Sequence, residues 1–266
     1  MPFILTIILA NNLQIVVACG PFTIQDTIAF EPLNDLINYV KENKPHVLIL
    51  TGPFYEKNNQ AIHTGKLRQS FDSFFTELVD TIMTSLENVD VKVVIASSQR
   101  EPHHYPVYPT PPYEIKGRYA NLTFVPDPFL LDINGVVVGA TTQDILFNMS
   151  TFEIHLDKTN SSADRMGRLA SHLLEQQSFY PLDPPSKDVC IDMTLMEKFG
   201  VMGVKPHILI LPSNLRYFVK EINECLVINP ERLAKGYSGG TFARIEVSPG
   251  STTTLCGRTA CQIMRI

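Results

Sequence analysis

Three short apolar runs alternate with two helical patterns over the first hundred residues, and this alternation restricts the possible folds more than any other feature. The runs cover Leu13–Cys19 and residues 46–50 and 91–96. Each is too short for a helix and largely apolar, which is typical of a strand buried on both faces. Between them, Glu31–Asn43 and residues 67–87 repeat apolar side chains with the period of a helix. The pattern predicts a parallel sheet covered by helices on both faces.

The remainder of the chain no longer alternates regularly between strand and helix patterns. Residues 101–112 contain five prolines, which excludes a helix or a central strand and predicts an ordered irregular loop or surface arm. Asn134-Gly135 is a hairpin-turn signal between strands expected at 130–133 and 136–138. A helix is expected at 164–176, and later strands at 207–211, 225–228, Thr241–Val247 and 260–266. No stretch poor in apolar residues divides the chain, so we expect one mixed α/β domain over residues 1–266.

Charge and cysteine usage limit the classes of partner and site. The 266 residues include 22 Lys and Arg against 27 Asp and Glu, a net charge of −5. This balance disfavours a free-standing nucleic-acid-binding protein, although a DNA-handling complex could carry its basic surface on another subunit. The five cysteines show no C-x-x-C spacing, so we expect no zinc site, no disulfide framework and a reducing compartment. The apolar run at residues 3–10 is too short to span a bilayer, so we expect a buried strand there and no membrane contact.

Ligands of open α/β sheets bind beyond the carboxyl ends of the strands. The segments at those ends are residues 18–21, 51–54, 97–101 and 212–215. A two-metal hydrolase needs aspartates, histidines and an asparagine in such segments, because divalent cations require carboxylate and imidazole ligands. The four segments contain no aspartate, no histidine and only one asparagine, Asn214. The sequence therefore places a site where a metal centre would lie, without the ligands that a metal centre needs.

The order and spacing of these segments resemble a calcineurin-type metallophosphoesterase. The D-x-H motif of that family would fall within 18–21, G-D-x-x-D corresponds to 52–56 with Pro53 at the bridging aspartate, G-N-H-D corresponds to 98–101, and G-H-x-H corresponds to 212–215. Residues 229–232 echo its N-P-G-S turn, and residues 239–243 match its closing strand. The resemblance implies a mixed β-sandwich flanked by helices, with no catalytic residue, metal or cofactor. It also implies a degenerate pocket, expected at Cys19, Gly20, Gly52, Pro53, Gln99, Arg100, Ser213 and Asn214.

Several longer strings resemble more narrowly the phosphoesterase-like domain of the B subunits of the DNA polymerase alpha–primase complex. They are V-A-C-G-P-F-T at 17–23, R-E-P-H-H at 100–104, P-V-Y-P at 106–109, L-R-Y-F-V-K at 215–220, N-P-E-R-L-A-K-G at 229–236 and G-G-T-F-A-R at 239–244. The resemblance covers residues 13–266. It implies a non-catalytic nuclear scaffold that binds the C-terminal region of the polymerase catalytic subunit during initiation of replication. Primase would be reached through the complex, and DNA at most indirectly.

Such B subunits carry an N-terminal helical domain, a tether and an OB domain before this region. We expect these to be absent here, so the chain would be a fragment, a mis-started gene model or a minimised relative. Aromatic and basic residues at two places could grip the partner, and the candidates are His103, His104, Tyr105, Tyr108, Arg216 and Tyr217. For the proline-rich loop, partner binding and plain packing are equally good interpretations. The alternative function is a divergent active metallophosphoesterase, with His103 and His104 as its only histidine pair near the strand ends.

Overall fold

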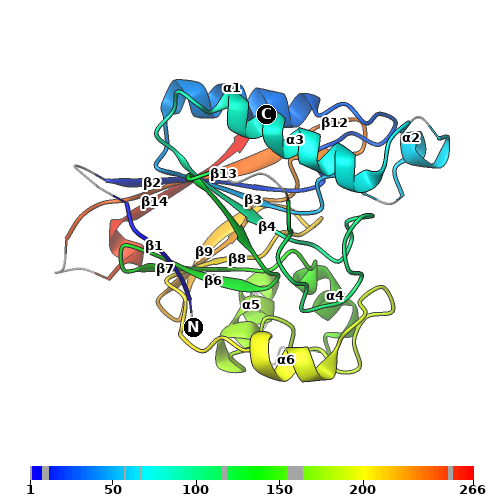
Figure 1. The fold of residues 1–266 in the computed structure, drawn as a ribbon. Helices are drawn as coiled ribbons and strands as arrows, with labels where there is room; N and C mark the ends of the chain where they lie inside the picture. The colour runs from blue at the N-terminus through cyan, green and yellow to red at the C-terminus, as the bar shows by residue number, and fades with distance from the viewer. Residues whose placement is uncertain are drawn as a thin grey trace.

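Two six-stranded sheets face each other at the centre of the molecule, and helices cover both outer faces (Figure 1). The structure is a computed structural model that describes residues 2–7, 12–56, 58–65, 67–115, 119–154, 164–250 and 254–266. The first sheet contains, in spatial order, β14 (Thr259–Arg265), β13 (Thr241–Val247), β2 (Leu13–Cys19), β3 (Val47–Thr51), β4 (Lys92–Ala96) and β5 (Leu122–Val125). The second contains β1 (Phe3–Leu5), β6 (Phe129–Ile133), β7 (Val136–Ala140), β8 (Ile208–Ile210), β10 (Cys225–Asn229) and β9 (Phe218–Ile222).

The predicted parallel order holds in the first sheet. Strands β2, β3, β4 and β5 pair in parallel, so their carboxyl ends lie at one edge. In the second sheet, β7, β8 and β10 also run parallel to one another. Strands β13 and β14 are antiparallel to their neighbours. The predicted mixed β-sandwich flanked by helices is confirmed.

Three apolar cores hold these layers together. One lies between the sheets and contains side chains such as Ile15, Val138 and Ile228. The second lies under α1 (Glu31–Asn43) and α3 (Phe71–Ser85), which cover the outer face of the first sheet. The third lies on the outer face of the second sheet, near the helices α4 (Ile145–Phe152), α5 (Arg165–Glu175) and α6 (Met193–Phe199). A strand covered on both faces must be apolar throughout, which is why β3 is buried at every position.

Local signals explain the remaining element bounds. The short helix α2 (Gln60–His63), the ribbon of β11 (Ala234–Lys235) and β12 (Ser238–Gly239) and the 3-10 turn η1 (Cys256–Arg258) complete the fold. Asn134 and Gly135 both adopt positive φ in the predicted hairpin between β6 and β7. The helix expected from residue 67 starts only at Phe71, because the Ser70 hydroxyl accepts a hydrogen bond from the Ser73 amide at 3.2 Å and caps it there.

The N-terminal run forms a strand, β1, as expected, but the expectation that it is buried was wrong. Phe3 and Ile4 belong to an edge strand and are 41% and 80% exposed. The run has an apolar composition, but only one neighbour, β6, pairs with it. Residues 8–10 of the same expectation lie outside the described residues. In the described part of the chain, none of the helices combines the length and apolar character needed to span a membrane.

Candidate functional site

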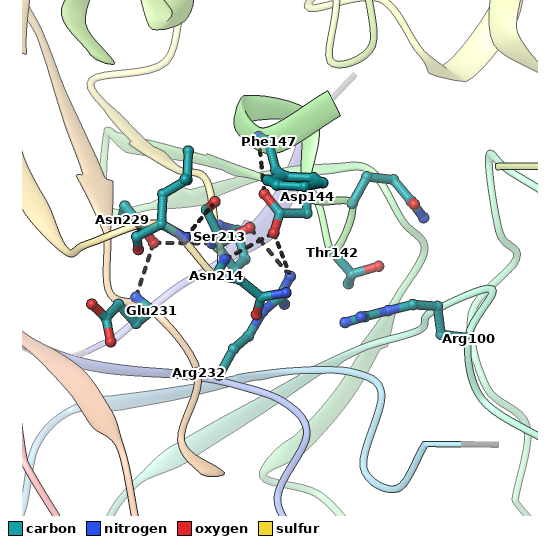
Figure 2. A network of polar contacts seen from close by, with 12 residues as sticks. Arg100, Thr142, Asp144, Phe147, Ser213, Asn214, Asn229, Glu231 and Arg232 are labelled. Atoms are coloured by element: carbon teal, nitrogen blue, oxygen red, sulfur yellow. Dashed lines mark hydrogen bonds and ion pairs between the residues drawn. The ribbon is translucent and has the colours of Figure 1, made fainter. Parts of the chain in front are cut away.

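The carboxyl ends of strands from both sheets meet in one polar network (Figure 2). Arg232, which follows β10, is at its centre and is only 2% exposed. Its Nη1 donates to the Gly20 carbonyl at 3.2 Å, beyond β2 of the first sheet. Its Nη2 donates to the Pro212 carbonyl at 3.4 Å, beyond β8 of the second sheet. One guanidinium therefore joins the strand-end edges of the two sheets.

Asp144 completes this junction from the segment after β7. Its Oδ2 accepts a hydrogen bond from the Asn214 amide at 2.8 Å and lies 3.9 Å from Nη2 of Arg232. Its Oδ1 accepts from the Phe147 amide at 3.1 Å and caps α4. Burial lowers the pKa of Arg232 to about 10, so the guanidinium stays protonated at neutral pH. The Arg232 guanidinium therefore places a positive charge in the middle of the site, beside Asp144.

The carboxamide of Asn229 shapes the neighbouring turn. Its Oδ1 accepts hydrogen bonds from the amides of Ser213 at 3.0 Å and Glu231 at 2.9 Å. Its Nδ2 donates to the carbonyls of Leu215 and Arg216. Asn229 is fully buried, so each of these bonds is made away from water and fixes the backbone firmly. Ser213 is therefore part of a turn whose backbone is held by Asn229.

Two glycines pack the strand ends of the first sheet too closely for side chains. The Gly20 amide donates to the Thr51 carbonyl at 2.8 Å, and a Cβ on Gly20 would lie 1.8 Å from the Pro53 carbonyl oxygen. A Cβ on Gly52 would lie 2.9 Å from that of Ser98. Cys19 is also fully buried beside them. Cys19, Gly20, Gly52 and Pro53 are therefore tightly packed where the two strands end.

Gln99 and Arg100 contact different neighbours. Nε2 of Gln99 donates to Oε1 of Gln143 at 3.1 Å, which links the ends of β4 and β7. Nη1 of Arg100 pairs with Oε1 of Glu56 at 2.8 Å. Figure 2 shows the Arg100 side chain extending toward Arg232, and the proximity of the two cations adds to the lowering of the Arg232 pKa. Of the predicted pocket residues, Gly20 bonds to Arg232 and Asn214 lines a pocket with it, whereas Gln99 and Arg100 bond to other partners.

Buried carboxylates hold the loops after β4 and β5. Oε2 of Glu101 accepts from the Phe54 amide at 2.7 Å and the Tyr113 hydroxyl at 3.0 Å, and Oε1 accepts from the Tyr55 amide at 3.3 Å. Burial nevertheless raises the pKa of Glu101 to about 8. Asp127 accepts from both the amide and the hydroxyl of Thr142, and burial raises its pKa to about 6.

The histidine pair packs into this structure. The His103 ring lies 4.5 Å from the Phe75 ring, and its Nδ1 lies 3.2 Å from the Tyr55 hydroxyl. Burial lowers the pKa of His103 to about 4, which keeps the ring neutral. Nε2 of His104 lies 2.6 Å from the Pro111 carbonyl and must donate to it. Within the described ranges, no three His, Cys, Asp or Glu side chains gather as a metal site would require.

The residues predicted to bind the partner lie in three different environments. Tyr105 is 64% exposed and borders a nearly apolar pocket of about 490 Å³, which is lined by Phe3, Val107, Pro109, Thr110, Pro111, Pro112, Pro126, Leu195 and Phe199. Tyr108 is fully buried, and its hydroxyl lies 3.1 Å from Oγ1 of Thr141. Tyr108 therefore packs the fold and cannot form part of an exposed contact surface, which corrects that expectation. Arg216 and Tyr217 are exposed elsewhere, and Tyr217 lines a pocket with Lys235 and Arg265.

Sequence reasoning missed the central members of the network. Arg232 stood in the turn at 229–232 that was matched to a family motif, and Asp144 followed a predicted strand. Both could have been found by extending the strand-end search to the segments that follow β7 and β10. Phe199 of α6 is 57% exposed and lines the apolar pocket. No pattern in the sequence indicated this position as part of a site.

The family and the relatives that match this chain in sequence carry closely related descriptions. Residues 15–220 match the protein family described as the DNA polymerase alpha/epsilon B subunit. The chain is 40% identical over 260 residues to the DNA polymerase alpha B subunit of Drosophila melanogaster, covering 96% of this chain and 41% of that protein. It is 39% identical to the corresponding Mus musculus protein, covering 89% of this chain and 40% of that protein. The chain thus spans about two fifths of the length of these relatives.

Two solved structures are also similar in fold. One is an archaeal phosphodiesterase, matched over 95% of this chain and 99% of its own at 9% identity with a TM-score of 0.43. The other is zinc-bound Vps29 of Entamoeba histolytica, matched over 95% and 98% at 10% identity with a TM-score of 0.37.

Proposed function

The chain belongs to the B-subunit family of DNA polymerases alpha and epsilon, and we propose that it is a non-catalytic accessory subunit of the DNA polymerase alpha–primase complex. In this role it binds the C-terminal region of the polymerase catalytic subunit and acts as a scaffold in the nucleus during initiation of replication. Primase is reached through the complex.

The proposal that the subunit is non-catalytic rests on which residues lie in the strand-end site. Arg232, Asp144 and Asn229 direct their polar groups at backbone atoms and at one another. A hydrolytic metal centre needs carboxylate and imidazole ligands with open coordination positions. A guanidinium held between the sheets instead places a fixed positive charge where a metal cation would have to bind.

The surface around Tyr105 supports the binding part. The pocket beside it is nearly apolar, and α6 above it has no fully buried residue. Proline-rich and aromatic surfaces lose little conformational entropy when a partner docks, because their side chains and backbone are already restricted. We therefore assign Tyr105 and the residues of this pocket to the partner contact, with His103 and His104 supporting the loop from beneath.

Co-purification tests the proposal directly. The chain and a tagged C-terminal region of the catalytic subunit are co-expressed, captured through the tag and analysed by gel filtration. We expect a complex of equal stoichiometry that survives dilution to micromolar concentration. Separate elution of the two proteins at that concentration, with the chain folded by circular dichroism, would contradict the proposal.

A further inference from the structure

A polar pocket lies beside the strand-end network and shares one lining residue, Lys235, with a second pocket. The first has a volume of about 230 Å³ and is lined by Arg232, Lys235, Asn58, Asn59 and Asn214, among others. The second has a volume of about 380 Å³ and is lined by Tyr217, Lys235, Thr241 and Arg265, among others. Lys235 lines both pockets, and we refer to these two neighbouring pockets together as the groove.

The first pocket contains an incompletely bonded cation. Nε of Arg232 is buried and makes no hydrogen bond within the described part of the chain, whereas both Nη atoms donate to carbonyls. A buried guanidinium N–H without a partner is unfavourable, and an oxyanion is the ligand that satisfies it best. The carboxamides of Asn58 and Asn214 line the same pocket and add neutral groups that can donate to oxygen.

The carboxylates of the groove are already engaged. Glu56 pairs with Arg100 at 2.8 Å. Glu231 accepts from Nζ of Lys235 at 3.3 Å and from the Tyr217 amide at 3.0 Å. Lys235 is 52% exposed, so its ammonium can turn toward an incoming anion at little cost.

The second pocket offers a stacking surface next to cations. The Tyr217 ring is 45% exposed, and the Arg216 guanidinium carbon lies 5.7 Å from its centroid. Arg265 lines the same pocket from β14. An aromatic ring beside basic side chains is the arrangement that binds a base together with its phosphate.

We propose that this groove binds a nucleotide unit, with its phosphate at Arg232 and Lys235 and its base stacked on Tyr217. The unit can be a free nucleotide or one residue of a single-stranded nucleic acid. A single unit requires only these few cations, so the net charge of −5 does not oppose it. This site goes beyond the proposed scaffold role and shares neither Tyr105 nor the apolar pocket with it.

Titration of the purified 266-residue chain tests the site. Fluorescence anisotropy with labelled single-stranded oligothymidylate, and calorimetry with thymidine monophosphate and with inorganic phosphate, are run at low and increasing salt. Tyr217→Ala should weaken oligothymidylate and mononucleotide binding about tenfold and leave phosphate binding unchanged. Lys235→Ala should weaken all three and reduce the salt dependence by about one ion.

Matched controls separate this result from general effects. Lys41→Ala removes an exposed lysine from the last turn of α1, and Tyr105→Ala removes an exposed tyrosine from the other pocket. Neither should alter nucleotide binding. Binding of the oligonucleotide but not of the mononucleotide would assign the site to a nucleic-acid chain, and binding of both would assign it to the nucleotide itself. Absence of nucleotide binding, or equal loss in the controls, would overturn the proposal without affecting the co-purification result.

Discussion

Arg232 and Asp144 face each other between the two sheets, with Nη2 of the arginine 3.9 Å from Oδ2 of the aspartate. The arginine also bonds to backbone of both sheets, at Gly20 and Pro212. The arginine therefore links the strand ends of the two sheets, with the aspartate beside its guanidinium.

Removing the arginine should expose its structural role. Arg232→Met is expected to lower the free energy of unfolding by about 3 kcal/mol, because it leaves Asp144 unpaired and two carbonyls without donors. The double variant Arg232→Met/Asp144→Asn should recover part of that loss, since the uncompensated charge is gone. Urea unfolding of the three proteins measures both effects. Equal stability of Arg232→Met and the parent would show that the pair does not hold the sheets.

Gly20→Ala tests the close approach of β2 and β3. The new Cβ would lie 1.8 Å from the Pro53 carbonyl oxygen, so the backbone would have to move. We expect a loss of about 3 kcal/mol or outright failure to fold. Gly203→Ala is the control, because its Cβ meets no atom within 4 Å and should change stability by less than about 0.5 kcal/mol. Thermal unfolding and soluble yield distinguish the two.

The buried Glu101 makes stability depend on pH. Because its pKa rises from 4.5 to about 8 on folding, the folded protein holds this proton more tightly than the unfolded chain. The stabilisation of the folded state by this proton is therefore fully present below pH 4.5 and is lost as pH rises through about 8. Glu101→Gln cannot titrate, and its Oε1 can still accept from Phe54 and Tyr113.

The pH effect is measured by urea unfolding of both proteins between about pH 5 and 9. The parent should lose stability relative to Glu101→Gln over this range. A constant difference between the two would mean that Glu101 keeps an ordinary pKa. Glu101→Ala should be less stable than Glu101→Gln at every pH, because all three donors to the carboxylate lose their acceptor.

Metal addition discriminates between the accessory subunit and a divergent hydrolase. With Arg232 and Asp144 at the strand ends, manganese should shift the melting temperature by less than about 1 °C and support no hydrolysis of a generic phosphodiester. Treatment with a chelator should likewise have no effect. Manganese-dependent turnover that disappears in His103→Ala or His104→Ala would establish the enzymatic alternative.

The apolar pocket should determine partner affinity. Tyr105→Ala is expected to weaken binding of the catalytic subunit's C-terminal region about tenfold, as removal of an aromatic anchor does. Tyr237→Ala removes an equally exposed tyrosine, 64% in each case, and should bind as the parent does. Calorimetric titration gives both affinities. Equal affinities would move the contact away from this pocket.

Consecutive residues were enough to predict the parallel core and the hairpin. Strands buried on both faces are largely apolar, so Leu13–Cys19 could be recognised without knowledge of its neighbours. The turn at Asn134-Gly135 follows from the positive φ that few residue pairs tolerate. Both signals are local, because backbone conformation and burial pattern depend on the residue types at neighbouring positions of the chain.

What fills the site depends on contacts that only the folded chain makes. Arg232 reaches the carbonyl of Gly20, which is 212 positions away in sequence, and no local pattern encodes that encounter. The same holds for Tyr108, whose proline-rich loop gives no sign of burial in sequence, although packing against the second sheet buries the ring completely. Phe3 shows the reverse case, since an apolar run stays at an edge when only one strand pairs with it. Contacts between distant segments depend on how the layers stack, and that geometry fixes which side chains meet.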